Sequence, residues 1–153
     1  MAQGDVHVFD QFLVDALEKK HDLENDLIYC ALTDGTTPPA TTTADPRWGA
    51  GGTTNFSSEE AAPQTGNYTT GGNVCSNPSV TLSGGQAEID FDDPATWSQN
   101  ASNPTNARYG IIYNNTSAGK ECIGYVDLGS TFNMTTGDLT ITWGAPFATL
   151  NQA

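Results

Sequence analysis

The side chains best suited to chemistry in this sequence form a short acidic run, Glu88, Asp90, Asp92 and Asp93. Carboxylate oxygens are the ligands that Ca²⁺ prefers, and residues two apart in an extended chain point to the same side. The run lacks the D-x-[DN]-x-[DN]-G spacing of a calcium-binding loop, however. We therefore predict that these residues form the solvated face of a strand and that they hold no metal ion.

Nucleophilic catalysis is the second chemistry to consider. The chain has two histidines, His7 and His21, and no G-x-S-x-G elbow or similar signature that would bring a base to a nucleophile. The glycine-rich stretch WGAGGTT has no lysine, and in SAGKE the lysine, Lys120, is followed by Glu121 rather than by Ser or Thr, as a phosphate-binding loop requires. We predict no catalytic residue, no cofactor and no enzymatic activity.

The three cysteines, Cys30, Cys75 and Cys122, are an odd number and include no C-x-x-C pair. Such a set fits neither a disulfide framework nor a zinc site. We expect three reduced, structural thiols. The alternative is a single bridge, most plausibly between Cys75 and Cys122.

Length and charge restrict the class of protein. The 153 residues fit one domain over 1–153, and a domain of that size buries roughly 70% of its unfolded surface. The 18 acidic and 5 basic residues give a net charge of -13, which argues against binding to a nucleic-acid backbone. No apolar run approaches the roughly 18 residues of a membrane span. Asp5 and the lack of an early basic segment predict no secretory signal.

Apolar residues near the start of the chain recur at helical spacing: Val8, Phe9, Phe12, Leu13, Ala16 and Leu17. Acidic residues come early in this segment and Lys19 and Lys20 come late, as the helix dipole favours. The pattern predicts an amphipathic helix over about 9–20.

The other regular patterns have the period of β-strands. They predict a buried strand over 27–33, a hairpin over 80–91 around Gly84 and Gly85, a second hairpin over 109–128, and a strand over 139–143. The second hairpin has apolar residues on both faces, so we expect it to be central in its sheet. The sequence therefore predicts a mainly β fold, a small antiparallel β-sandwich or partly open barrel, with a core from 27–33 and 80–145 and one N-terminal helix packed on it.

Between these strands, the chain over about 36–79 is dominated by Thr, Pro, Gly, Ala and Asn. A loop of that length is far outside the usual range for a compact domain. Trp48, Phe56 and Tyr68 are spaced along it, and a solvated linker has little use for large aromatic side chains. The pattern predicts an extended arm, held by a partner through these three aromatics. Phe9 and Phe12 join this candidate interface if the helix meets a partner, and the alternative for them is core packing.

Four segments carry a family resemblance: MAQGDVHVFDQF, ADPRWGAGGTTNFSSEE, WSQNASNPTNARYGIIYN and GYVDLG. With them, nearly the whole chain resembles a group of small structural proteins of tailed bacteriophages. The resemblance implies a virion component, most like a capsid decoration or cement protein that is made in the host cytoplasm. It would bind outside the head, with the major capsid protein and neighbouring copies of itself as partners. A trimer or dimer is the oligomeric state to test, because decoration proteins commonly sit at symmetry axes.

Two other functions remain open at this stage. One is a tail, neck or baseplate subunit of the virion. The other is a carbohydrate-binding module on a virion fibre, which would use Trp48, Trp97 or Tyr68 as stacking platforms for sugar rings.

Overall fold

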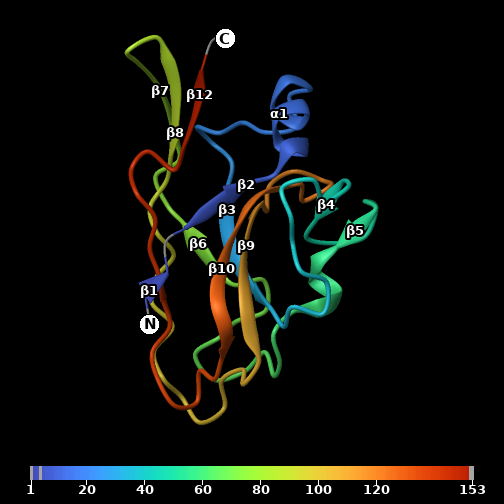
Figure 1. Ribbon diagram of the computed structural model, residues 1–153, viewed down its shortest axis with the longest axis vertical. Helices are drawn as coiled ribbons and strands as arrows, with labels where there is room; N and C mark the ends of the chain where they lie inside the picture. Colours follow the sequence, from blue (N-terminus) through green and yellow to red (C-terminus); the bar gives the residue numbers. More distant parts are fainter. Residues whose placement is uncertain (1, 4, 152–153) are drawn as a thin grey trace.

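A computed structural model describes residues 2–3 and 5–151 (Figure 1). These residues are mainly β, with one α-helix and one short 3-10 helix among them. In chain order the elements are β1 (Ala2–Gln3), β2 (Val6–Val8), α1 (Asp10–Leu17), β3 (Ile28–Thr33), β4 (Pro46–Arg47), β5 (Thr54–Asn55), η1 (Phe56–Glu59), β6 (Asn73–Cys75), β7 (Ser79–Ser83), β8 (Gln86–Asp90), β9 (Ala107–Asn114), β10 (Cys122–Phe132), β11 (Thr140–Ile141) and β12 (Ala148–Asn151).

A five-stranded antiparallel sheet, in the order β2-β10-β9-β3-β6, forms the centre of the molecule. The hairpin of β9 and β10 occupies the middle of it, and side chains on both of its faces are buried. Ile112 belongs to a first core cluster, and its neighbour Ile111 belongs to a second. The prediction of a central hairpin with two apolar faces is confirmed.

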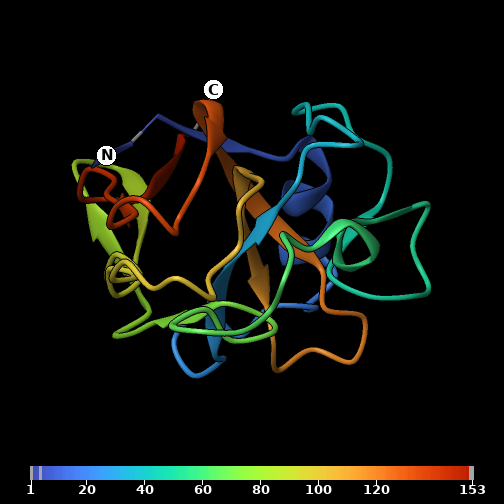
Figure 2. The same ribbon diagram turned by 90° about the horizontal axis from the view of Figure 1, so that it is seen from below.

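The second face of this sheet is covered by the segment that the sequence analysis expected to be an extended arm. Figures 1 and 2 show β4, β5 and η1 lying against one side of the central sheet, opposite the chain around β7 and β8. Trp48 and Phe56 from this segment pack into the second core cluster. The expectation of an arm over 36–79 is therefore not confirmed, because its aromatic side chains supply a layer that the domain itself needs.

The helix ends earlier than predicted, at Leu17 rather than near residue 20. Lys19 adopts a left-handed conformation with φ of 61°. The Lys20 N–H then donates to the Asp15 carbonyl at 2.9 Å and the Lys19 N–H donates to the Ala16 carbonyl at 3.2 Å. This pair of bonds is a Schellman motif, which satisfies the last carbonyls and reverses the chain.

A separate three-stranded antiparallel sheet, in the order β12-β8-β7, rises at one end of the molecule beside α1 (Figure 1). Its β7–β8 hairpin turns at Gly84 and Gly85, as predicted. Only its base joins the first core cluster, through Ile89, Phe147 and Ala148. The predicted strand over 139–143 shrinks to β11. The described sheets do not close into a barrel, and a complete sandwich is not confirmed.

All three cysteines are free and buried. Cys30 and Cys75 belong to the first core cluster, whereas Cys122 belongs to the second. The alternative bridge between Cys75 and Cys122 does not form. Burial raises the pKa of each thiol, so none of them is an activated nucleophile.

Candidate interaction surface

The five residues expected at a partner interface all lie inside the domain. Phe9 and Phe12 are fully buried, and so is Phe56. The Phe9 ring lies 6.1 Å from the ring of Phe56 and 5.3 Å from that of Tyr125. Phe9 and Phe12 therefore pack in the core, which is the alternative that the sequence left open for them.

Trp48 and Tyr68 are buried as well. Trp48 stacks on Tyr113 with ring centroids 5.1 Å apart, and its main-chain N–H donates to the Lys120 carbonyl at 2.9 Å. The Tyr68 hydroxyl donates to Glu60 Oε1 at 2.9 Å and accepts from the Leu32 N–H at 3.0 Å. The expectation of an exposed aromatic interface is therefore corrected, because these rings fill the protein's own core.

The same burial affects the expected stacking platforms for sugars. Trp97 is buried beside Tyr68, with ring centroids 6.2 Å apart. A sugar ring needs an accessible aromatic face. Trp48, Tyr68 and Trp97 offer none in this fold.

The acidic run fastens a loop instead of gathering around a metal ion. Asp90 Oδ1 accepts from the Phe147 N–H at 3.0 Å, and Asp93 Oδ1 accepts from the Trp143 N–H at 2.9 Å. Asp92 Oδ2 accepts from Asn77 at 2.6 Å. Among the described residues, no group of three or more His, Cys, Asp or Glu side chains is placed to hold a metal ion.

A buried polar cluster lies under the end of α1. Asp15 is fully buried, and its Oδ1 accepts from Lys20 Nζ at 2.9 Å and from Gln11 at 2.9 Å. His21 Nδ1 lies 3.1 Å from Asn114 Nδ2, and burial lowers the His21 pKa. The ion pair of Asp15 with Lys20 holds the reversed chain against the helix, so this cluster stabilises the fold.

Exposed apolar side chains gather at the end of the molecule that carries α1 and the three-stranded sheet. On the helix, 46% of Leu13, 48% of Val14 and 86% of Leu17 is exposed. On the sheet, the exposed fraction is 82% for Leu82 and 37% for Leu150. Isolated exposed apolar residues are ordinary, whereas exposed apolar residues that form one continuous patch can bind other molecules.

The pairing of the three strands explains why one face of this sheet is apolar. Val80, Ile89 and Ala148 lie opposite one another across β7, β8 and β12, and Leu82, Ala87 and Leu150 form the next row. Directly opposed residues share a face, so both rows lie on one side, and Thr81, Glu88 and Thr149 lie on the other. The apolar face is buried at its base and open towards its tip.

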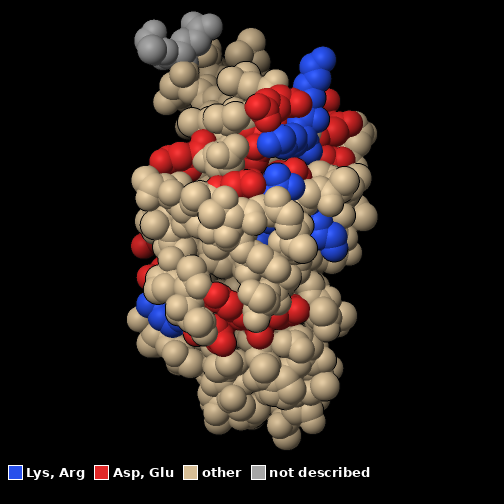
Figure 3. Space-filling model, turned by 90° about the vertical axis from the view of Figure 1, so that its right-hand side faces the viewer, with Lys and Arg blue, Asp and Glu red and all other residues tan. Residues whose placement is uncertain are grey.

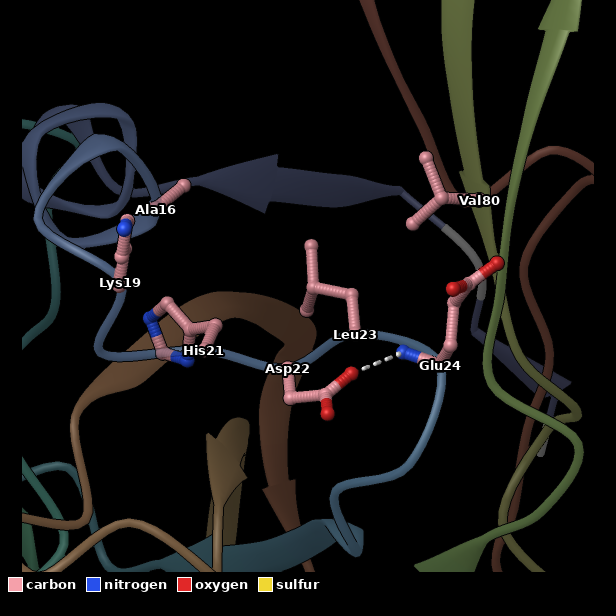
Figure 4. Close-up of a pocket in the computed structure, with 7 residues that line it drawn as sticks. All are labelled: Ala16, Lys19, His21, Asp22, Leu23, Glu24 and Val80. Carbon is pink, nitrogen blue, oxygen red and sulfur yellow. Dashed lines mark hydrogen bonds between the residues drawn. The ribbon is translucent and has the colours of Figure 1, made fainter.

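A groove of about 470 Å³ separates this apolar face from the end of the helix. Figure 4 shows Val80 of β7 on one side of it, Ala16 and Lys19 on the other, and Leu23 between them. We name this groove, together with the open apolar face of β7, β8 and β12, the tip surface.

The charge around the tip surface is mainly negative. Asp22 and Glu24 line the groove, with Lys19 as the one basic residue among those that line it. Lys20 is engaged by Asp15 and by Glu18, at 2.9 Å and 3.0 Å. On the side of the molecule shown in Figure 3, one group of acidic and basic side chains lies in the upper half and a second group lies below the middle, whereas the lower end is uncharged.

Comparisons with known protein families, curated proteins and solved structures found no match. In the described part of the chain, no helix combines the length and hydrophobicity needed to traverse a bilayer.

Sequence reasoning found the components of the tip surface but assigned them to the core. The alternation of Val80, Leu82, Ala87 and Ile89 is visible in the sequence, and so is the helical stripe that includes Ala16. Neither pattern says which apolar face remains uncovered. That depends on how far the projecting sheet stands from the rest of the domain.

Proposed function

We propose that this chain is a non-enzymatic structural protein of a tailed bacteriophage virion, a capsid decoration protein that binds outside the head. Its partners are the major capsid protein and neighbouring copies of itself on the shell. The resemblance of four sequence segments supplies the virion role, and the tip surface supplies a means of binding.

The observation that carries a binding function is the open apolar face beside the groove. Leu82, on this face, exposes 82% of its surface to water. Covering apolar surface stabilises a complex by about 25 cal/mol per Å² before the costs of association. A rigid domain that keeps such a surface open is suited to bind another protein.

The other groups that can do chemistry are engaged in the fold. The thiols are buried, Asp90 and Asp93 fasten a loop, and Asp15 pairs with Lys20. These contacts support a structural role over catalysis. They also support a protein–protein contact over sugar binding, since the aromatic candidates for sugar stacking are buried.

In this proposal, the second layer of the expected sandwich comes from the partner. The apolar face of β7, β8 and β12 lacks a second layer at its tip, and the capsid subunit supplies it on binding. Repetition over a symmetric shell allows a modest affinity at each contact to hold many subunits together.

Addition of the purified protein to heads that have been stripped of decoration proteins tests this function. We expect saturable binding in a fixed ratio to the major capsid protein, and heads that release their DNA at a higher temperature once decorated. Purified tails serve as the comparison. Binding to tails and not to heads would replace this proposal by the alternative of a tail, neck or baseplate subunit.

A further inference from the structure

Strand β7 forms one free edge of the three-stranded sheet, and this edge is open to another strand. In the order β12-β8-β7, strand β7 pairs only with β8. Among the described residues, no hydrogen bond connects Ser79–Ser83 to any segment other than β8. An edge strand in this state offers a row of unpaired N–H and C=O groups to another chain.

The sequence of β7, SVTLS, contains none of the devices that protect such an edge. Edge strands of monomeric proteins are blunted by lysine, proline, a bulge or an inward-pointing charge. The pairing of β7 with β8 runs without a break from Ser79–Asp90 to Ser83–Gln86, so no bulge is present. The edge is therefore continuous, uncharged and suited to accept a strand.

The groove lies beside this same edge, because Val80 of β7 lines it. Every second side chain of a strand added to β7 would lie on the apolar face, next to Val80 and Leu82. Those side chains would face the groove, towards Leu23 and Ala16 (Figure 4). One added strand would thus hydrogen-bond to β7 through its main chain and bury its apolar side chains in the groove at the same time.

The charge of the tip surface indicates which chain adds the strand. Asp22 and Glu24 line the groove, and the whole chain carries a net charge of -13. A second copy would bring the same acidic groups to the contact, whereas a basic partner would be attracted to them. The complementary occupant is a strand with apolar residues at alternate positions and Lys or Arg at its ends.

We propose that a partner protein adds an extended strand of this chemistry to the free edge of β7 and fills the groove with its apolar side chains. This inference rests on the proposed function, in which the partner is the major capsid protein. It deepens that function by naming the element and the charge through which the partner is recognised.

Fluorescence anisotropy with a labelled synthetic peptide of sequence KVTVTLK tests the strand addition on the full chain. Controls are the charge-reversed peptide EVTVTLE and a KVTVTLK peptide N-methylated at alternate main-chain nitrogens. We expect KVTVTLK to bind and each control to bind at least about tenfold more weakly, since one loses the charge match and the other loses main-chain hydrogen bonds. Equal binding of the N-methylated peptide would overturn strand addition.

Two matched variants locate the contact. Val80 and Thr149 lie at opposite edges of the sheet, Val80 on the apolar face beside the groove and Thr149 on the other face. We expect Val80→Lys to weaken peptide binding at least about tenfold, because a lysine at a strand edge opposes pairing with a basic strand, and Thr149→Lys to leave binding unchanged. Equal losses in both variants would overturn the assignment to β7. Circular dichroism verifies that each variant is folded.

Binding to heads distinguishes strand addition to β7 from the decoration function on which it rests. If the wild-type protein and Val80→Lys add to heads equally well, the inference fails and the decoration role stands. If the wild-type protein binds KVTVTLK but not heads, the decoration role fails and strand addition stands. Self-association of the wild-type protein in sedimentation that Val80→Lys abolishes would make a second copy the occupant and overturn the proposed partner.

Discussion

The two larger antiparallel sheets of this protein have alternating apolar side chains, yet they differ in what covers them. The central sheet is covered on both faces, so Ile111 and Ile112, adjacent in β9, are both fully buried. In the three-stranded sheet, Ile89 is buried at the base while Leu82, nearer the tip, is largely exposed. The central sheet receives both its layers from the chain, whereas one face of the other sheet stays open at its tip.

A charge placed in each sheet gives the largest contrast. Ile111→Asp buries a carboxylate in the second core cluster, and we expect it to unfold the domain through a loss on the order of 4 kcal/mol or more. Tyr125→Asp, in the neighbouring strand, is expected to have the same effect. Leu82→Asp is expected to change the free energy of unfolding by less than about 0.5 kcal/mol. Urea denaturation followed by circular dichroism measures all three.

If Leu82→Asp destabilised the protein as strongly as Ile111→Asp, the tip would be part of the core and the comparison would fail. If Leu82→Asp kept the wild-type free energy of unfolding but no longer bound heads, stability would depend on the central sheet and binding on the three-stranded sheet.

The layer over the second face of the central sheet is tested by Phe56→Ala. Phe56 is fully buried against Phe9, so its truncation should lower the free energy of unfolding by about 3–5 kcal/mol. Leu17→Ala on the exposed side of α1 is the control, with an expected change within about 0.5 kcal/mol. Thermal unfolding of both variants measures the difference. A stability unchanged by Phe56→Ala would restore the interpretation of this segment as an arm that waits for a partner.

This segment also shows which parts of the fold the sequence predicts and which it does not. The strands were found from period-two patterns that are local, such as Val80 and Leu82 before the turn at Gly84. The layer containing Trp48 and Phe56 has no such period. Its strands β4 and β5 are only two residues long, and its aromatic rings reach the central sheet from irregular backbone. Local patterns carry no information on contacts of this kind.

The helix shows a different limit. Its apolar stripe was predicted from spacing, but the structure buries Asp15 beside Phe12 and exposes Leu17. Asp15 is buried in an ion pair with Lys20, and the left-handed Lys19 turns the chain away after Leu17. The buried face of the helix therefore differs from the apolar stripe in the sequence. The apolar residues of the helix were therefore visible in the sequence, and the exposure of Leu17 was not.

Alkaline pH should destabilise the central sheet, because the buried acids with raised pKa values pack on it. Burial raises the pKa of Cys30 and of Tyr68 above the ordinary values of 9.0 and 10.0. Above those ordinary values the unfolded chain releases protons that the folded chain retains, so stability falls as pH rises. Each such group contributes up to about 1.4 kcal/mol per pH unit.

Urea denaturation between pH 7 and pH 11 measures this slope. We expect Cys30→Ala to make the slope above pH 9 shallower by up to about 1.4 kcal/mol per pH unit, whatever its effect on stability at pH 7. Leu82→Asp at the tip should leave the slope unchanged. An identical slope in Cys30→Ala would show that this thiol is not protected by the central sheet.

The smallest effect is expected at the turn that joins β9 to β10. Lys120 has a left-handed backbone with φ of 48°, and its carbonyl accepts from the Trp48 N–H. Alanine keeps that carbonyl and meets the same backbone strain, so Lys120→Ala should change the free energy of unfolding by less than about 0.5 kcal/mol and leave head binding intact. Denaturation and the head-binding assay measure the two properties. Because this turn belongs to the central sheet, loss of head binding in a fully folded Lys120→Ala protein would move the partner contact from the tip surface to the body of the domain.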